Sequence, residues 1–447
     1  MKKFRKKQLS VSEAIALTFF ALILAGAALL ALPFSSRDGH SCGLLTALFT
    51  ATSSVCVTGL SVVDTWTQWS AAGQVVILCL IEIGGLGFMS AASILFFIFN
   101  RDIDIYRLSV IAQSIGSENL SDVLTIQKRL LKGAAAIQLT GAAILCAKLA
   151  PRYGFGKALW LGIFHAISAF CNAGFDVMGF EAAGTSLAVL QGDAVIVLTL
   201  IALIAVGGLG FLVWDELYRV RSPRRWSVYT RLVLIVSTVL LVGGTLAYLL
   251  LEYANPATFG TLSFPQKLLA AAFQSMTTRT AGFAGVAQGD LTQGSQVLTM
   301  LLMFIGGSSG STAGGVKTVT FFILLLFLYT RIRGRKEVEI FNRSLADNQI
   351  MDALTIVILI TLLGFGGGFF LCVTSQLDFL ACLFESYSAL ATVGLSLGIT
   401  SQLSVCSKLL IILYMYIGRV GILTLCISLR DKNKIQYSYP KVSLLIG

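Results

Sequence analysis

Four short loops carry the residues of this sequence whose types and spacing could do chemistry. Each is rich in small residues, ends in a glycine and precedes a long apolar segment. The loops read Val55-Cys56-Val57-Thr58-Gly59, Phe170-Cys171-Asn172-Ala173-Gly174, Thr278-Arg279-Thr280-Ala281-Gly282 and Leu390-Ala391-Thr392-Val393-Gly394. Successive glycines are 115, 108 and 112 residues apart, and a period this regular indicates one structural unit repeated four times. Four rows of backbone carbonyls around one axis can replace the water around a monovalent cation.

Composition places these loops in a membrane. The chain has 447 residues, of which 56% are hydrophobic and only 12% are charged, whereas ordinary soluble domains are about 25% charged. The mean hydropathy is +0.84. Apolar runs of roughly 20 residues recur, which is the length that spans a bilayer as a helix. We therefore expect a polytopic helical membrane protein.

The distribution of the net charge of +11 indicates how the chain is oriented in the membrane. Of the 33 Lys and Arg residues, 24 lie in five polar segments, which are 2–13, 100–132, 215–231, 331–349 and 430–447. Clustering of positive charge on one side of a membrane marks the cytoplasmic side. The pattern predicts that both termini are cytoplasmic, and it argues against nucleic acid as a partner. The nine cysteines are scattered singly, which predicts neither a disulfide framework nor a zinc site.

The elements that must position the loops repeat with them. Each unit is expected to consist of an outer helix, a short re-entrant helix, the loop and an inner helix. The predicted outer helices are 12–32, 131–150, 231–251 and 350–373, the re-entrant helices 42–54, 159–169, 265–276 and 380–389, and the inner helices 74–99, 193–217, 296–330 and 408–429. The re-entrant helices are too short to cross.

The predicted fold is an all-α polytopic membrane protein. It has four tandem helix–pore loop–helix units, with eight transmembrane helices and four re-entrant half-helices in a pseudo-fourfold arrangement around a single pore. The units are 1–100, 101–220, 221–340, whose inner helix is broken, and 341–447, which ends in a cytosolic tail.

A second motif on the inner helices supports this register. A pair of small residues follows the loop glycine by 25, 33, 24 and 24 residues, and the pairs are Gly84-Gly85, Gly207-Gly208, Gly306-Gly307 and Gly418-Arg419. Small residues let helices approach closely in lipid. The glycines serve either close packing or the lining of the pathway, and the sequence leaves both readings open.

With these two motifs, the chain resembles the Trk/Ktr/HKT superfamily of potassium transporters over essentially its whole length. The ending 439–447, and the expected absence of spans before the first unit, look most like the bacterial KtrB-type membrane subunit. The resemblance implies potassium uptake across the cytoplasmic membrane, a homodimer, and a cytosolic nucleotide-binding ring of the KtrA or TrkA type as regulatory partner. No cofactor is expected in this chain. Potassium is the expected cargo, bound at the filter only, and sodium is a candidate co-ion.

The loops themselves are predicted to form the ion filter. Glycine fits a turn with positive φ, and the C-terminal ends of the half-helices carry partial negative charge that favours a cation. Each loop has one glycine, whereas the potassium-channel filter TVGYG has two, which predicts weaker discrimination against sodium. Asp64 and Asp176 lie just outside two loops and could attract cations. Arg279 is expected to point away from the axis and to pair with Glu385.

A gate is predicted below the filter. The third inner helix is interrupted by ten small residues that hold a helix poorly, namely Gly306, Gly307, Ser308, Ser309, Gly310, Ser311, Thr312, Ala313, Gly314 and Gly315. Arg419 replaces the second glycine of the pair and is expected to face the pore, as a barrier to cations and as a donor to the carbonyls of the loop. The alternatives are a kink that only packs and an Arg419–Glu82 pair. Lys317 is expected to anchor the loop.

A hydrolase and a secondary transporter are the two alternatives to a channel-like route. Gly306-x-Ser308-x-Gly310 fits the GxSxG pattern of hydrolases, but a hydrolase needs a histidine after the serine. The two histidines, His40 and His165, precede it, so we expect no enzyme. A secondary cation symporter with alternating access is the serious alternative, since such transporters also use repeats and broken helices.

Overall fold

The computed structural model describes residues 11–87, 123–181, 186–335 and 337–421. These residues are mainly helical, with one two-stranded antiparallel hairpin of β1 (Glu339–Ile340) and β2 (Arg343–Ser344). The basic segment 2–7, most of 100–132 and the ending 439–447 lie outside the described residues.

Four long helices correspond to the predicted outer helices. They are α1 (Val11–Leu30), α7 (Val123–Tyr153), α11 (Val228–Glu252) and α15 (Asp347–Ser375). All four are long and apolar enough to cross a membrane, and a third or so of each apolar window is buried inside the protein. Large apolar side chains such as Leu139, Leu246 and Leu362 therefore stay exposed on their outer faces, as expected of helices that face lipid.

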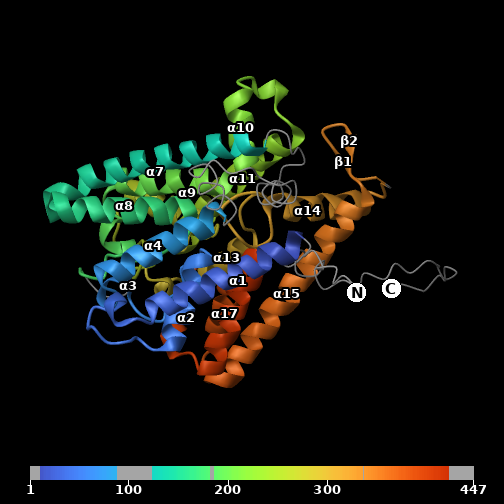
Figure 1. The fold of residues 1–447 in the computed structure, drawn as a ribbon. Coiled ribbons are helices and arrows are strands. Elements are labelled where there is room, and N and C mark those ends of the chain that lie inside the picture. Colours follow the sequence, from blue (N-terminus) through green and yellow to red (C-terminus); the bar gives the residue numbers. More distant parts are fainter. Residues whose placement is uncertain (1–10, 88–122, 182–185, 336, 422–447) are drawn as a thin grey trace, which may run out of the picture.

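Four shorter helices follow the outer ones, as predicted. They are α2 (Leu44–Val55), α8 (Phe155–Cys171), α12 (Phe264–Thr277) and α16 (Phe379–Leu390). Each packs along the outer helix that precedes it, and Figure 1 shows this for α7 and α8. A helix of 12 residues, such as α2, is about 18 Å long, which is well short of the roughly 30 Å of a bilayer core.

The inner helices are interrupted more often than predicted. The helices are α4 (Ala71–Leu86), α9 (Ala194–Leu209) with α10 (Phe211–Arg219), α13 (Gln293–Phe304) with α14 (Thr318–Ile332), and α17 (Val405–Val420). The predicted inner helix 193–217 is not continuous, because α9 and α10 meet at an angle of 95°. Gly210 stands at the bend with φ +92°, a conformation that ends a helix and favours glycine.

Gly87 and Gly421 end α4 and α17 in the same way, with φ +85° and +92°. The remaining parts of the predicted helices 74–99 and 408–429 lie outside the described residues. The short connecting elements are α3 (Thr65–Gln68) and the 3-10 helices η1 (Pro33–Ser35), η2 (Ser186–Leu190), η3 (Pro223–Arg225), η4 (Gln288–Asp290) and η5 (Thr400–Gln402).

Contacts between the units close a cycle. The inner helix of each unit packs against the short helix of the next unit in pairs α4–α8, α9–α12 and α13–α16, and α17 of the last unit packs against α2 of the first. The fold therefore brings the ends of all four short helices toward one region.

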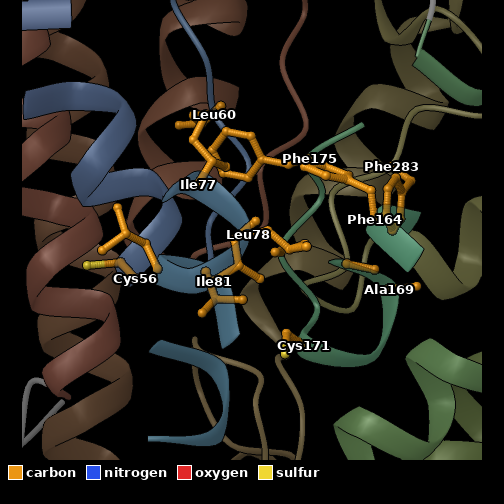
Figure 2. Packing of buried hydrophobic residues seen from close by; sticks show 14 of the residues in the cluster. Cys56, Leu60, Ile77, Leu78, Ile81, Phe164, Ala169, Cys171, Phe175 and Phe283 are labelled. Carbon is orange, nitrogen blue, oxygen red and sulfur yellow. The ribbon is translucent and has the colours of Figure 1, made fainter. Parts of the chain in front are cut away.

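The apolar core lies between these helices. Its largest cluster includes Ile77 and Ile81 of α4, Leu60 after the first loop, and Phe164 of α8, all fully buried or nearly so. Figure 2 shows Ile77, Leu78 and Ile81 between the first loop, with Cys56 and Leu60, and the second, with Cys171 and Phe175. The inner helix thus packs on both neighbouring loops, which fixes the position of one loop relative to the next.

Candidate functional site

The four loops share one backbone conformation. Their glycines have positive φ, and so does the residue two positions before each glycine. The φ angles are 55° and 97° for Val57 and Gly59, 59° and 68° for Asn172 and Gly174, 68° and 79° for Thr280 and Gly282, and 52° and 93° for Thr392 and Gly394. The sequence indicated the glycines only. A β-branched residue such as Val57 is a rare choice for this conformation, so tertiary contacts must hold it there.

Hydroxyl side chains at the ends of the short helices hold the loops. The backbone N–H groups of Gly59 and Gly394 donate to the Oγ atoms of Ser53 and Ser388, both at 3.1 Å. In the other two units Ser168 and Thr277 donate from their hydroxyls to the carbonyl oxygen of the residue after the loop glycine, both at 2.7 Å. Sequence reasoning missed these four residues. A hydroxyl five or six positions before each glycine was the available signal.

The loops meet at their glycines. A Cβ atom placed on each glycine would fall within 2.8 Å of a carbonyl oxygen of another loop. The pairs are Gly59 with Ala173 at 2.6 Å, Gly174 with Ala281 at 2.8 Å, Gly282 with Val393 at 2.3 Å and Gly394 with Thr58 at 2.1 Å. The carbonyl always belongs to the residue before the next glycine, and the fourth pair returns to the first loop. All four predicted loops are therefore brought together in ring order.

The loop side chains point into the protein. Every non-glycine side chain of the four loops is buried, and Arg279, at 7%, is the most exposed of them. Cys56, Phe170, Cys171, Thr278, Leu390 and Ala391 are among those at 1% or less. Because these side chains pack into the surrounding protein, away from the point where the loops meet, the space between the loops is lined by backbone atoms.

A cavity of about 320 Å³ opens on one side of the four glycines, and all four line it together with Asp64 and Asp176. Asp64 Oδ1 accepts from the N–H of Thr67 at 2.8 Å, and Asp176 Oδ1 accepts from the N–H of Met178 at 3.1 Å. Burial raises the pKa of the Asp176 carboxyl, and the negative charge of Asp64 adds a smaller rise. Two acidic groups thus border the mouth of the loop ring.

The expected pair between Arg279 and Glu385 is wrong. Arg279 points away from the ring as predicted, but its Nη2 donates to Ser237 Oγ of α11 at 3.2 Å. Glu385 Oε1 accepts from Thr400 Oγ1 at 2.5 Å instead. Arg279 lies just after α12 and Glu385 lies within α16, and each side chain bonds to a residue of its own unit.

The paired glycines of the inner helices allow close packing against the loops. A Cβ on Gly84 would lie 2.1 Å from the Val55 oxygen, and one on Gly207 would lie 2.0 Å from the Phe170 oxygen. Gly418 repeats the arrangement, at 2.2 Å from the Leu390 oxygen. In these three units the first glycine of the pair is therefore required by close contact with the end of the short helix.

The segment 305–317 is an ordered, non-helical loop that fills the break in the third inner helix. Ile305 and Val316 form a parallel bridge. Hydrogen bonds tie the loop to itself and to neighbouring helices, among them Gly306 N to Val316 O at 2.8 Å, Ser308 N to Gly208 O at 3.1 Å, Phe211 N to Gly310 O at 2.9 Å and Tyr229 Oη to Ser309 O at 2.9 Å. The loop is thus seated on the bend at Gly210.

The remaining residues of the loop 305–317 contact other residues of the same loop and the fourth unit. Ser311 Oγ donates to Ser308 O at 2.6 Å, and Gly307 packs against Ala313. Gly314 and Gly315 pack against Thr392 and Ala391 of the fourth loop. Lys317 Nζ donates to Ala313 O at 2.6 Å, which is the anchoring contact expected for it.

Arg419 holds the other side of the loop. Its guanidinium donates to the carbonyl oxygens of Thr312 in the loop and of Gly84 and Gly85 in α4. The alternative pair with Glu82 does not form, because Glu82 accepts from Gln138 Nε2 at 3.0 Å and from Cys171 Sγ at 3.3 Å. One partly buried guanidinium therefore joins the loop to the first and fourth inner helices.

Comparison with known proteins agrees with this architecture. The sequence model of the TrkH family, described as a cation transport protein, matches residues 7–436. The chain is 40% identical to the potassium/sodium uptake protein NtpJ of Enterococcus hirae, covering 100% of this chain and 99% of that protein. It is 38% identical to the Ktr system potassium uptake protein B of Bacillus subtilis, covering 97% and 96%.

Among solved structures, the potassium transporter TrkH of Vibrio parahaemolyticus matches with a TM-score of 0.73 at 20% sequence identity, over 96% of this chain and 86% of that one. This likeness supports the helical membrane fold. These relatives are uptake and transport proteins rather than enzymes, which confirms the expectation of no enzyme. The chain belongs to the TrkH family of cation transport proteins.

Proposed function

We propose that this chain provides a channel-like route for potassium uptake across the cytoplasmic membrane of a bacterium, with both termini in the cytoplasm. The names of its relatives, which refer to potassium uptake, support the choice of ion. Gradients and the membrane potential supply the energy, at about 2.3 kcal/mol per elementary charge per 100 mV. Potassium is the cargo, and sodium is a candidate co-ion because one relative is named a potassium/sodium uptake protein.

The observation that carries the proposal is the ring order of the four loops. The carbonyl oxygens of Thr58, Ala173, Ala281 and Val393 lie beside the glycines of the neighbouring loops. Such oxygens can replace the hydration shell of a cation, and irregular backbone at membrane depth is tolerated where it is buried or lines a cavity. We assign the filter to these four loops and keep the division into units 1–100, 101–220, 221–340 and 341–447.

The loop 306–315 and Arg419 form the proposed gate. Backbone that is not helical at membrane depth belongs next to a cavity, and Arg419 joins this loop to two inner helices. In the closed state the loop and the positive charge block the path below the filter. Opening requires the loop to leave either Arg419 or the bend at Gly210.

The proposed assembly is a homodimer with a cytosolic nucleotide-binding ring of the KtrA or TrkA type. Two relatives are named as parts of a Ktr system, which supports a multi-component assembly. The basic cytosolic segments, such as 331–336, offer a docking face for this partner.

A cation symporter with alternating access is the second candidate. Two observations favour it: the third inner helix is interrupted, and one relative is named a potassium/sodium uptake protein. Flux that follows the membrane potential without a fixed sodium stoichiometry supports the channel-like route. Saturable flux with a fixed sodium-to-potassium ratio supports the symporter.

The test is growth of a potassium-uptake-deficient bacterium that expresses the chain, compared with Gly59→Ser and Gly394→Ser. Both substitutions place atoms against a facing carbonyl, so we expect loss of preference for potassium over sodium at equal expression. Gly43→Ser is the matched control, because Gly43 also has positive φ but nothing within 4 Å of its Cβ position. Unchanged ion preference in both loop variants would remove the filter assignment.

A further inference from the structure

A cavity of about 190 Å³ lies behind the third loop and has one charged group in its lining. Helices α9 and α11 form most of its wall, through apolar side chains such as Ile204, Leu234 and Leu241. Arg279 enters from the end of α12, and Gly307 of the loop 305–317 closes another part of the wall. The cavity therefore touches both the third loop and the proposed gate.

Arg279 is a buried cation without an anionic side chain beside it. Its side chain is 93% buried, and no carboxylate lies within 4.0 Å of it among the residues that the structure describes. Its contacts are Nη2 to Ser237 Oγ at 3.2 Å and Nη1 to Ser237 O at 3.5 Å. The Nε atom is buried with no hydrogen-bond partner among the described atoms. Two of the five guanidinium N–H donors are therefore engaged, and one of those bonds is long.

The surrounding backbone compensates part of this charge. Arg279 lies two residues after Thr277, the last residue of α12, and the C-terminal end of a helix carries roughly half a negative charge. The remaining positive charge lies in an apolar wall near a ring proposed to hold further cations. A charge in such a position needs a partner of opposite sign.

We propose that this cavity binds a small inorganic monovalent anion, chloride under physiological conditions, between the guanidinium of Arg279 and the α11 wall at Ser237. The free Nε–H is the first donor to the anion, and the remaining guanidinium N–H groups are the others. The small volume and the apolar wall favour a compact ion over a phosphate group. Because Gly307 lines the same cavity, the bound anion neutralises Arg279 beside the gate. The site itself does not depend on the proposed transport mechanism.

Bromide provides the direct test, because its anomalous scattering identifies it in a crystal. We expect an anomalous peak beside the Arg279 guanidinium in crystals of the full chain soaked in sodium bromide. The peak should be lost in Arg279→Gln and also in Ala205→Leu, which fills the cavity from α9 without changing the charge. Ala202→Leu is the matched control, since Ala202 lies on the same helix but lines a different, outward groove, and it should keep the peak.

Thermal unfolding in detergent gives a second readout that does not involve transport. A ligand that binds the folded state raises Tm with its concentration. Replacing gluconate by chloride at constant ionic strength should therefore raise the Tm of the unmodified chain and of Ala202→Leu, but not of Arg279→Gln or Ala205→Leu. The proposal is overturned if water alone occupies the cavity in crystals soaked in bromide. It is also overturned if the bromide peak and the chloride-dependent rise in Tm persist in both Arg279→Gln and Ala205→Leu. Normal potassium uptake alongside either result would leave the proposed function intact.

Discussion

At the scale of single residues, the four loops proposed as the filter store backbone strain that neighbouring residues must offset. Val57, Thr280 and Thr392 adopt left-handed φ values although their side chains branch at Cβ. Such positions cost of order 1–3 kcal/mol each. The hydrogen bonds that the Oγ atoms of Ser53 and Ser388 accept from the backbone N–H groups of Gly59 and Gly394 and the packing of the inner-helix glycines offset this cost. A loop held in this way keeps its carbonyls in place when no ion is bound.

Gly418→Ala is predicted to destabilise the protein by about 1–3 kcal/mol, the usual cost of overpacking a filled site. Its Cβ would lie 2.2 Å from the Leu390 oxygen, and backbone cannot move aside as a flexible side chain can. The measurement is Tm in detergent.

Gly366→Ala on α15 is the control for this change, because nothing lies within 4 Å of its Cβ position. Alanine is favoured over glycine in a helix by about 1 kcal/mol, so this variant should be as stable as the unmodified chain or more so. Equal Tm values for the two variants would mean that the close packing at Gly418 has no energetic weight.

At the scale of elements, glycines with positive φ end or bend three of the inner helices. They are Gly87, Gly210 and Gly421. In the third unit the break widens into the loop 305–317, which rests on the bend at Gly210 through the bond from Phe211 N to Gly310 O. The loop and the bend are therefore held together, and the loop is bonded to Tyr229 on one side and to Arg419 on the other.

Removing contacts that hold the loop 305–317 in place should speed potassium flux. Tyr229→Phe removes one hydrogen bond to Ser309 O, worth about 1 kcal/mol, so roughly a fivefold rise in the open population is expected. Arg419→Gln removes the positive charge and should have a larger effect. The measurement for both variants is the rate at which liposomes of equal protein content take up a tracer under a potassium gradient.

The matched control is Tyr414→Phe. Its hydroxyl donates to Leu363 O at 2.7 Å, a comparable bond between α17 and α15 that does not involve the loop. Flux should be unchanged in this variant. Slower or unchanged flux in both loop variants would count against a gate at 306–315.

Composition and length were sufficient to predict the outer and short helices. A continuous apolar run of about 20 residues has few alternatives in a membrane. The bend at Gly210 could not be predicted in this way. Val206-Gly207-Gly208-Leu209-Gly210 reads as small residues inside an apolar helix, and the positive φ of Gly210, which turns the chain there, cannot be read from that pattern.

At the scale of the whole molecule, the four units form a closed cycle in which each inner helix braces the next short helix. Contacts of α17 with α2 close this cycle. The repeat period predicted the four loops, and the two motifs predicted their register. The partner of Arg279 was not predictable, because the choice between Ser237 and Glu385 depends on how α12 sits against α11. The cavity beside the four loop glycines, where all four units meet, carries Asp64 and Asp176.

Acidic external pH should weaken apparent potassium affinity through Asp176. Its raised pKa means that the carboxyl takes up a proton at a higher pH than an ordinary aspartate, and the neutral form no longer attracts cations to the mouth. At low ionic strength, where such attraction is strongest, we expect roughly a twofold to fivefold rise in the KM for potassium. Uptake kinetics in liposomes across a range of external pH measure it.

Asp176→Asn should remove most of this pH dependence, whereas Asp290→Asn, an exposed acidic residue that does not line the mouth, should keep it. A pH profile of Asp176→Asn that matches the unmodified chain would exclude Asp176 as the titrating group.

The central claim is that four carbonyl-bearing loops bind the transported ion between them. Rubidium, which resembles potassium and scatters X-rays anomalously, tests it most directly in crystals of the chain. The account predicts rubidium peaks enclosed by the carbonyl oxygens of Thr58, Ala173, Ala281 and Val393, reduced in Gly394→Ser and retained in Gly43→Ser. Rubidium that binds elsewhere, while the space between the four glycines stays empty, would contradict it.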